Sequence, residues 1–548
     1  MKTKRTLQFL ALMVTAILTS AFTAFAYVKG DVDGDDKVGL QEAIYSLQAA
    51  SNLKFPLSSN TINVPSDIPT IQEAVDAASD GDIILLAAQT YTEAITINKK
   101  SIILRGAGRD QTVIDGNGEH VITIEASPGV AIENLAVQNG NKGIYAHNNS
   151  KVKISQLIVQ DCSDRGVQIG DSSVGELSDT TIENNGGDGV GVLLNSSLTI
   201  NGTVDITNNR YGIVALLSSA VLFDNSTITS QGNAVDGVVA VSNSALYTYL
   251  STLTLDSNNR DGMRVAVNSS SYNNANGTIN SSGNAENGIS VFGTSRLYSA
   301  GNISVQGSGE FGIIGEGSCD ISIEGPCSIQ TCSNTGFIAA RSSSVWLESE
   351  LQILNCSGYG ISIERASALQ NNDAAVIAVT GTVEPWGVGI GVNGNSIWRA
   401  NGGSFTIQNN SGSGIAVGRN STLSLRNRGS GLSATISGNS GSGIFSYQQG
   451  CIRLDQGVAL SDNSENGISL YSSSECDIHD IAIQNNSTWG INADKLSSVN
   501  VYDSTISGNT NGDVNLSFGS VSELIGNTIG TMSCDSTVLS RGTHTCSQ

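Results

Sequence analysis

Asn463-Ser464-Glu465-Asn466-Gly467-Ile468-Ser469-Leu470 is the clearest copy of a motif that recurs through most of this 548-residue chain. The first and last motif glycines lie 512 − 143 = 369 residues apart over 15 intervals, a mean period of 24.6 residues. Self-similarity at one fixed period predicts a solenoid whose stacked units share a continuous core. The motif glycines are at positions 143, 166, 189, 212, 237, 262, 288, 312, 336, 360, 389, 414, 443, 467, 490 and 512.

One unit, residues 467–488, reads GISLYSSSECDIHDIAIQNNST and contains three short runs of alternating apolar residues. Such runs are typical of strands with one buried face, and no part of the unit has helical spacing. Parallel strands need their inner face covered, and a coil that closes on itself provides that cover. The sequence therefore predicts an all-β fold. We expect a right-handed parallel β-helix of about 16–18 coils over residues 62–530, followed by a C-terminal tail at 531–548.

Two polar rows mark the expected turns. Asparagines stacked at an inward turn can hydrogen-bond along the axis and satisfy backbone groups there. The motif glycine supplies either a backbone conformation that other residues avoid or room for close packing. The second row is rich in serine, as at Ser196-Ser197 and Ser472-Ser473. The asparagine row, four residues before the glycine, comprises Asn139, Asn185, Asn208, Asn233, Asn258, Asn284, Asn410, Asn439, Asn463 and Asn486, with Cys162, Cys332 and Cys356 in the same position.

The nine cysteines leave their pairing open. Cys332 and Cys356 fall on consecutive coils, where the axial spacing permits a disulfide. Cys534 and Cys546 could join the two ends of the tail. An odd count leaves at least one thiol unpaired within a monomer.

Residues 1–26 have the features of a secretory signal. Lys2, Lys4 and Arg5 precede an apolar run, and Ala24-Phe25-Ala26 forms a cleavage motif. No later apolar run is long enough to span a bilayer. The protein is expected to be secreted, extracellular or on the cell surface, and a periplasmic location is also compatible with such a signal. A net charge of −22 argues against nucleic acid and anionic membranes as partners.

The stretch from Asp31 to Glu42 carries oxygen ligands at loop positions 1, 3, 5 and 12, the spacing that wraps Ca²⁺. Asp31, Asp33 and Asp35 would supply side-chain oxygens, Lys37 its carbonyl, and Glu42 a bidentate carboxylate. Residues 27–54 resemble one half of a dockerin module, which implies a calcium cofactor and a cohesin-like partner. A dockerin normally has two such repeats and only one is present here, which leaves the cohesin partner in doubt. A linker at 55–61 follows.

Residues 70–78 (TIQEAVDAA) predict a short amphipathic helix with Thr70 as N-cap and Glu73 three residues later. Residues 81–118 continue with GDIILL, then TYTEAITI, then LRGAGRDQTVIDGNG. This order resembles the opening of pectin-lyase-like β-helices, in which a helix caps the first coil and protects an open strand edge. The resemblance extends over residues 62–530. It implies the fold but no single activity, because this fold hosts lyases, hydrolases, esterases, epimerases, adhesins and stalks.

Three segments resemble catalytic motifs known in this fold, and ordinary turn and strand chemistry is the alternative explanation for each. Asp236 and Asp261, with Arg264 nearby, resemble the carboxylate and arginine set of pectate lyases, although Asp before Gly is also a common turn preference. Asp477-Ile478-His479-Asp480 resembles the Asp-Pro-His-Asp constellation of alginate epimerases, with His479 as the acid–base candidate. Gly202-Thr203-Val204-Asp205 resembles only the start of the nucleophile segment of pectin methylesterases.

Two intervals between motif glycines are longer than the others, at 360–389 and 414–443. Longer loops on a solenoid often carry its function. Aromatic and cationic side chains near them could stack on and grip a sugar chain. The candidate carbohydrate-binding residues are Trp386, Trp398, Arg399, Arg426 and Arg428.

The sequence favours a carbohydrate-associated binding scaffold with a calcium-binding N-terminal segment, because no complete catalytic set is found. An extracellular polysaccharide is the expected partner. A polysaccharide lyase or uronate epimerase, and a structural stalk or adhesin, are the alternative functions.

Overall fold

The computed structural model describes residues 60–383, 387–427 and 431–542. The predicted signal segment, the calcium loop and most of the linker lie outside these ranges. Trp386 and Arg428 lie outside them as well. From Thr61 onward the described chain belongs to one compact unit.

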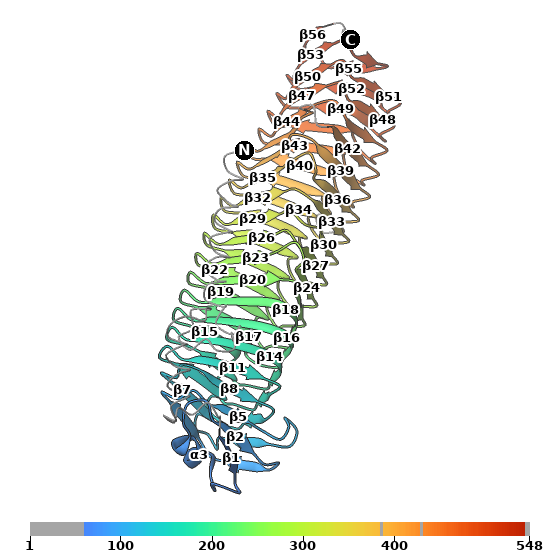
Figure 1. The fold of residues 1–548 in the computed structure, drawn as a ribbon. Helices are drawn as coiled ribbons and strands as arrows, with labels where there is room; N and C mark the ends of the chain where they lie inside the picture. Colours follow the sequence, from blue (N-terminus) through green and yellow to red (C-terminus); the bar gives the residue numbers. More distant parts are fainter. Residues whose placement is uncertain (1–59, 384–386, 428–430, 543–548) are drawn as a thin grey trace, which may run out of the picture. The chain divides into compact units, whose positions relative to one another are not determined.

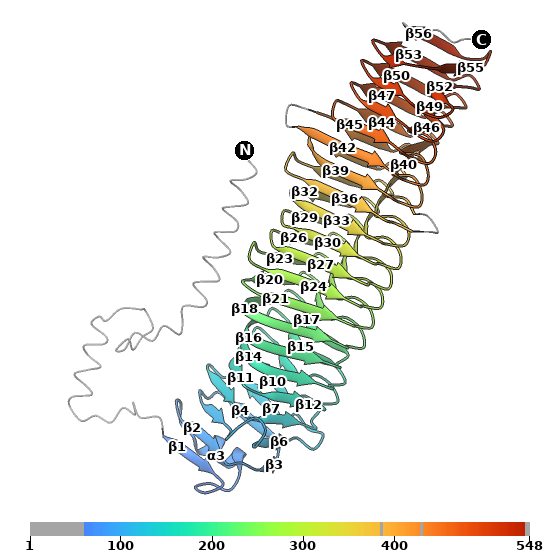
Figure 2. The same cartoon turned by 90° about the vertical axis from the view of Figure 1, so that its right-hand side faces the viewer.

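Apart from the two ends of the stack, each coil of this unit contributes strands to three parallel ladders, and successive coils stack on one another (Figures 1 and 2). Within a coil the chain passes through ladder 1, then ladder 2, then ladder 3; in the unit quoted above these are Ile468–Tyr471, Glu475–His479 and Ala482–Gln484. The predicted parallel β-helix is confirmed.

Ladder 1 consists of β4 (Ile95–Asn98), β7 (Ile122–Glu125), β10 (Ile144–His147), β13 (Val167–Ile169), β15 (Asp188–Leu193), β17 (Tyr211–Leu216), β19 (Val238–Val241), β22 (Met263–Ala266), β25 (Ile289–Phe292), β28 (Ile313–Glu316), β31 (Phe337–Ala340), β34 (Ile361–Glu364), β37 (Ile390–Asn393), β40 (Ile415–Gly418), β43 (Ile444–Tyr447), β46 (Ile468–Tyr471), β49 (Trp489–Ala493), β52 (Gly512–Leu516) and β55 (Met532–Cys534).

Ladder 2 consists of β1 (Thr61–Val64), β2 (Ile83–Leu86), β5 (Ile103–Arg105), β8 (Val130–Glu133), β11 (Lys151–Ser155), β20 (Ala245–Tyr249), β23 (Ser270–Asn273), β26 (Arg296–Ser299), β29 (Asp320–Ile323), β32 (Ser344–Leu347), β35 (Ala368–Asn371), β38 (Ile397–Ala400), β41 (Thr422–Leu425), β44 (Cys451–Leu454), β47 (Glu475–His479), β50 (Ser498–Tyr502), β53 (Val521–Ile525) and β56 (Leu539–Gly542).

Ladder 3 consists of β3 (Thr90–Thr92), β6 (Val113–Asp115), β9 (Ala136–Gln138), β12 (Ile158–Gln160), β21 (Thr252–Asp256), β24 (Thr278–Ser282), β27 (Asn302–Gln306), β30 (Cys327–Gln330), β33 (Glu350–Leu354), β36 (Val376–Thr380), β39 (Gly403–Gln408), β42 (Leu432–Ser437), β45 (Val458–Ser461), β48 (Ala482–Gln484), β51 (Thr505–Ser507) and β54 (Thr528–Ile529). Three long strands, β14 (Val174–Glu183), β16 (Ser197–Thr207) and β18 (Ala220–Gln231), run through both ladders 2 and 3.

Ladder 1 contains 19 strands, against the 16–18 coils expected. Sixteen of them, β10 to β52, belong to the sixteen copies of the glycine motif. Strands β4, β7 and β55 lack the motif, so the sequence period does not reveal them. At ~4.8 Å per coil, 18 steps give a solenoid of roughly 86 Å. The ladders continue past residue 530, because β55 and β56 pair with β52 and β53.

A short helix covers the start of the stack. Helix α3 spans Ile71–Ala77 and buries Ile71, Ala74 and Val75. The Thr70 hydroxyl accepts a hydrogen bond from the backbone N–H of Glu73 (3.2 Å), which confirms the predicted N-cap.

The asparagine row forms a buried hydrogen-bonded ladder, as predicted. Asn233 Nδ2 donates to Asn258 Oδ1 (2.8 Å), and Asn258 Nδ2 donates to Asn284 Oδ1 (3.0 Å). The same oxygens also accept backbone N–H groups of the preceding coil. The members in the structure are Asn185, Asn209, Asn233, Asn258, Asn284, Asn410, Asn439, Asn463, Asn486 and Asn509.

Two residues that the sequence assigned to this row, Asn208 and Asn139, do not belong to it. Asn209, rather than Asn208, enters the ladder, because the turn to Gly212 is one residue shorter than at neighbouring coils. Asn208 is exposed with a φ of 56°. Asn139 is also exposed and donates to Asp115 Oδ2 (2.7 Å).

The motif glycine is required for close packing. At Gly237 a Cβ would lie 2.6 Å from the carbonyl oxygen of Gly262, and at Gly262 it would lie 2.7 Å from that of Gly288. Neither glycine has a positive φ. Of the two roles left open by the sequence, the structure selects close approach between coils.

The serine row is structural as well. The hydroxyl oxygen of Ser269 accepts from the backbone N–H of Ser244 (3.1 Å), and that of Ser295 accepts from Ser269 (3.2 Å). Cys332 and Cys356 occupy the asparagine-row position with free, buried thiols, so the disulfide that the sequence permitted between them is not formed. Cys534 is disulfide-bonded, and Cys546 lies outside the described residues.

Candidate functional site

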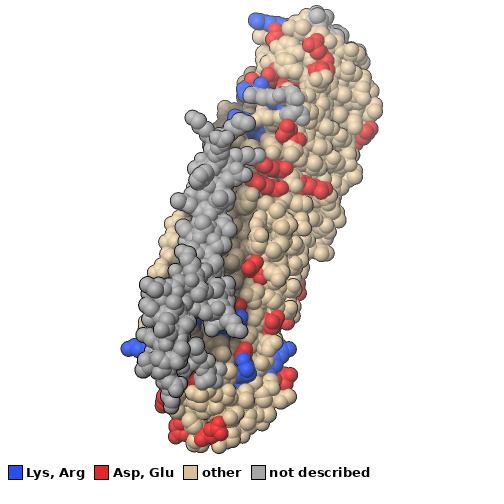
Figure 3. All heavy atoms as spheres, in the orientation of Figure 1, with Lys and Arg blue, Asp and Glu red and all other residues tan. Residues whose placement is uncertain are grey.

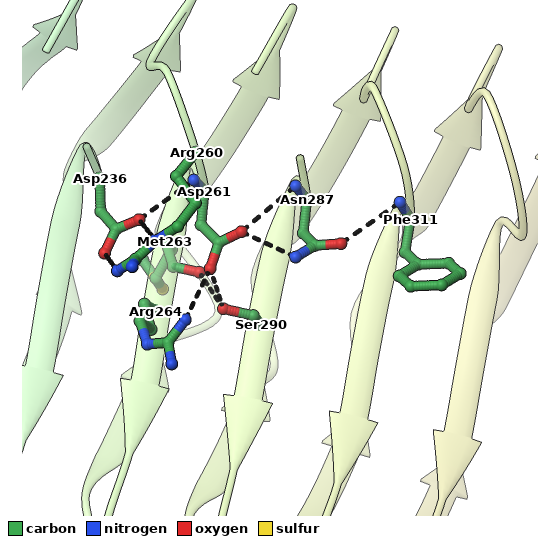
Figure 4. A network of polar contacts seen from close by, with 8 residues as sticks. All are labelled: Asp236, Arg260, Asp261, Met263, Arg264, Asn287, Ser290 and Phe311. Atoms are coloured by element: carbon green, nitrogen blue, oxygen red, sulfur yellow. Dashed lines mark hydrogen bonds and ion pairs between the residues drawn. The ribbon is translucent and has the colours of Figure 1, made fainter. Parts of the chain in front are cut away.

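The acidic candidates Asp236 and Asp261 lie on consecutive coils, at the turn that enters ladder 1 (Figure 4). Both side chains are 0% exposed. Arg260 Nε donates to Asp236 Oδ1 (2.8 Å), and Arg260 Nη2 donates to Asp236 Oδ2. The backbone N–H of Asp261 also donates to Asp236 Oδ1 (3.1 Å). Asp236 is therefore held by a bidentate arginine and by the next coil.

Asp261 repeats this arrangement one coil further along. Its Oδ1 accepts from the backbone N–H (3.2 Å) and Nδ2 (2.7 Å) of Asn287. Its Oδ2 accepts from Ser290 Oγ (2.6 Å), with Arg264 Nη1 at 3.4 Å. Burial raises the pKa of the Asp261 carboxyl, and the hydrogen bond from Ser290 opposes that rise. The structure thus brings Asp236, Asp261 and Arg264 together in one network, with each carboxylate engaged by groups of the chain itself.

This network predicts a contrast between two substitutions. Asp261→Ala leaves the donors of Asn287 and Ser290 without their acceptor, and we expect the unfolding free energy to fall by about 2–3 kcal/mol. Asp261→Asn keeps a side-chain oxygen that can accept the backbone N–H of Asn287, just as Asn287 Oδ1 accepts the backbone N–H of Phe311 on the next coil. This substitution should lower the unfolding free energy by less than about 1 kcal/mol. Urea unfolding of both variants measures the difference. Equal losses would contradict the proposed acceptor role.

His479 lies on the outer face of ladder 2, on β47. Its ring stacks on Tyr502 at 4.6 Å between centroids, and its Nε2 is 3.3 Å from Asp477 Oδ1. The side chain of His479 is 50% exposed, whereas Ile478 between the two is fully buried. The Asp-Ile-His segment thus places a partly exposed aspartate beside an exposed histidine on an ordinary strand.

Trp398 is a correction to the predicted carbohydrate-binding set. It is 0% exposed, packs edge-on against Phe405 at 5.6 Å, and donates from Nε1 to Asn371 Oδ1 (3.3 Å). In the strand Ile397–Ala400 the second residue points inward, so Trp398 fills the core and cannot meet a ligand.

Arg399 and Arg426 do share one face. Arg399 pairs in register with Ser424, and Ser424 pairs with Arg453, which sequence reasoning missed. Arg426 lies two residues after Ser424, and alternation along the chain places it on the same side. Arg399 and Arg453 are exposed and Arg426 is half-buried. Among the described residues none of the three arginines forms an ion pair. Figure 3 shows Lys and Arg in only a few small groups.

A cavity of about 230 Å³ opens near the N-terminal end, where β14 and β16 run through the corner between ladders 2 and 3. Arg109, Asp179 and Asp205 line it, together with threonines. The backbone N–H of Thr203 donates to Asp179 Oδ1 (3.1 Å). Asp205 therefore faces this cavity.

In the part of the chain that the structure covers, no three His, Cys, Asp or Glu side chains gather as a metal site would require. Across residues 60–542, apart from the two short gaps, no helix has the length and apolarity that a bilayer crossing needs.

Comparison with known proteins agrees with the fold. A family model described as "Right handed beta helix region" matches residues 100–253. The chain folds as a right-handed parallel β-helix. A cell surface glycoprotein of Methanothermus fervidus is 33% identical over 101 residues, which are 18% of this chain and 17% of that relative. The aligned part thus spans less than a fifth of the relative's length.

Solved structures give weaker matches. The catalytic unit of a GH87 α-1,3-glucanase from Streptomyces thermodiastaticus aligns with 14% identity and a TM-score of 0.41, covering 64% of this chain and 69% of that one. Pectate lyase Pel9A aligns with 13% identity and a TM-score of 0.32, covering 55% of this chain and 78% of that one. At these values the likeness carries no inference about activity.

Proposed function

We propose that this protein is an exported scaffold, extracellular or on the cell surface, that binds acidic carbohydrate through Arg399, Arg426 and Arg453. The observation that carries the proposal is the set of three guanidinium groups on three consecutive coils, none of them in an ion pair with another described residue, within a chain of net charge −22. In such an acidic protein, arginines without carboxylate partners are available to an external anion.

The chemistry of arginine fits a sugar acid. A planar guanidinium offers a fork of N–H donors that matches a carboxylate or sulfate in two parallel hydrogen bonds. A densely charged polyanion such as nucleic acid would be repelled by the overall charge, whereas a sparsely charged glycan would be repelled much less. The similarity of one segment to a cell surface glycoprotein, and the signal-like N-terminus, support an extracellular setting.

The proposal includes a calcium-binding N-terminal segment. Its support is the spacing of Asp31, Asp33, Asp35, Lys37 and Glu42 in the sequence, which fits the oxygen ligands of Ca²⁺. Such a segment would attach the scaffold to a partner, with a cohesin-like protein as the partner that the dockerin resemblance implies. Calorimetric titration of the full-length mature chain with Ca²⁺ tests whether this segment binds calcium. The absence of any heat of binding would contradict the calcium-binding role.

The arginine cluster yields a binding prediction. Arg399→Ala combined with Arg453→Ala should weaken the binding of an acidic oligosaccharide by at least about tenfold, since each charge-assisted hydrogen bond is worth about 1.5–3 kcal/mol. Glycan arrays identify the ligand, and calorimetry with the full-length mature chain gives the affinity. Arg341→Ala is the matched control, because Arg341 is exposed but already paired with Glu316 (2.7 Å).

Two outcomes would contradict the binding-scaffold function. If the native chain bound none of the acidic or neutral glycans on an array, the binding-scaffold function would be contradicted. Release of unsaturated uronides, abolished by His479→Ala, would replace it with a lyase that uses the Asp477–His479 pair.

A further inference from the structure

One outward row of ladder 2 concentrates aromatic and cationic side chains. The row is defined by residues that pair in register from coil to coil, each ten positions after a motif glycine. Asp477 follows Arg453 in the same register. From Tyr247 to Arg453 the members are Tyr247, Tyr272, Tyr298, Ser322, Trp346, Gln370, Arg399, Ser424 and Arg453. We call these nine residues the ten-position row.

The aromatic half of the row forms a partly desolvated surface. Tyr247 and Tyr272 stack with centroids 5.4 Å apart and planes 7° from parallel. Tyr298 is tilted by 46° to Tyr272, so the stack opens towards the small Ser322 and then Trp346. All four aromatic side chains are half-buried. Burial raises the pKa of Tyr247, and burial together with Glu324 raises that of Tyr298 to about 12.

Carboxylates flank this aromatic half. Tyr298 donates its hydroxyl to Glu324 Oε2 (2.8 Å), and Trp346 donates Nε1 to Glu348 Oε1 (2.8 Å). Glu324 and Glu348 would accept hydrogen bonds from sugar hydroxyls and would repel a sugar carboxylate. The aromatic half therefore suits uncharged sugar units, with their apolar faces on the rings.

The other half of the row suits charged units. Arg399 and Arg453 follow Trp346 in the same register, with Gln370 and Ser424 between them. From Tyr247 to Arg453 there are eight coil steps, or ~38 Å at ~4.8 Å per coil. The two halves form one straight track parallel to the solenoid axis.

The equivalent row of ladder 3 has a different character. Its members from the same coils are Thr254, Asn280, Ser304, Ser328, Gln352, Ala378, Thr406, Thr435 and Ala459. No aromatic or cationic side chain occurs among these nine. The concentration on ladder 2 is thus a property of that face and not of strand composition in general.

We infer that the ten-position row is an extended binding track for a linear polysaccharide that lies along the axis and carries carboxylates on only some of its units. Neutral units rest on Tyr247, Tyr272, Tyr298 and Trp346, and acidic units bind Arg399 and Arg453. The inference rests on the proposed function and gives it a ligand class and a direction along the solenoid.

The test uses substitutions that the chain itself accepts at this position. Tyr272→Ser and Trp346→Gln introduce the residues found at Ser322 and Gln370, so the coils should still fold. The probes are pectins of graded methyl-esterification and short, fully acidic oligogalacturonides. Binding to the full-length mature chain is measured by calorimetry, with far-ultraviolet circular dichroism to verify folding. Tyr471→Ser, on ladder 1, is the control for loss of an exposed tyrosine.

The double variant Tyr272→Ser/Trp346→Gln should bind partly esterified pectin about tenfold more weakly than the native chain, because two aromatic stacking contacts with the sugar are lost. Its affinity for the short acidic oligosaccharide should be unchanged, whereas Arg399→Ala/Arg453→Ala should lose both ligands. Unchanged pectin binding in the aromatic variant would overturn the track and leave the arginine site standing. Failure of the native chain to bind either probe would overturn the track.

Discussion

Asn258→Leu is expected to lower the unfolding free energy of the coil stack by about 4 kcal/mol, through the loss of several buried hydrogen bonds at once. Asn258 Oδ1 accepts from both the backbone N–H (3.2 Å) and Nδ2 (2.8 Å) of Asn233. Asn258 Nδ2 donates to Ser230 O (3.1 Å) and to Asn284 Oδ1 (3.0 Å). Leucine branches at the same carbon but is larger and can replace none of these bonds, so buried polar groups on two adjacent coils lose their partners.

The measurement is urea unfolding followed by circular dichroism. Asn302→Leu is the matched control, because Asn302 is exposed on β27 and its side chain faces solvent. That control should remain within about 0.5 kcal/mol of the native chain. Strand pairing joins each coil only to its neighbours, so partial proteolysis should find the weakened point near the coil of Asn258. A loss as small as that of the control would show that the asparagine ladder adds little to stability.

The period of the glycine motif was sufficient to predict the fold, because each unit is built by the same local pattern of alternating strands. Coils without the motif were missed for the same reason: β4 and β7 bury Ile95 and Ile122, and β55 partly buries Met532, with no glycine directly before any of the three. The Asn208 error has a different origin. A turn shortened by one residue moves the ladder position to Asn209, and a fixed offset from the glycine cannot detect that.

The candidate site was predicted less well, because composition near long loops does not say which side of a strand a residue occupies. Trp398 stands nine positions after its glycine, where neighbouring coils have the buried Leu369 and Leu423. Alignment of the units would have placed it in the core. The same alignment would have revealed Tyr272 and Trp346 one position further on, at the outward row.

The burial of Asp236 and Asp261 could not be foreseen from spacing alone. Aspartate before glycine is common in turns, and only the structure shows that Arg260 of one coil reaches Asp236 of the preceding coil. The internal ladders and this network bind the coils to one another from within. The outward rows are therefore free to differ between faces, which is how a regular solenoid can carry a specific binding surface.

The second large effect concerns the motif glycine itself. Gly262→Ala is expected to destabilise the chain by about 3 kcal/mol, at the upper end of overpacking costs, because the added methyl group meets backbone. Its Cβ would lie 2.7 Å from the carbonyl oxygen of Gly288 and 2.2 Å from Ser281 Oγ. Ser281 Oγ itself donates to Gly288 O (2.9 Å), so neither atom can move without breaking that bond. The coils would have to separate locally.

Gly129→Ala provides the control for this experiment. Gly129 also lacks a positive φ, and a Cβ there would have Ser101 Oγ as its nearest neighbour at 3.7 Å. Alanine reduces the conformational entropy of the unfolded chain, so this control should be neutral or stabilised by about 0.4–1 kcal/mol. Opposite signs for the two substitutions in urea unfolding would establish that space between coils, and not backbone conformation, fixes glycine in the motif. A native-like midpoint for Gly262→Ala would mean that adjacent coils can separate at little cost, and the period of glycine would then need another physical cause.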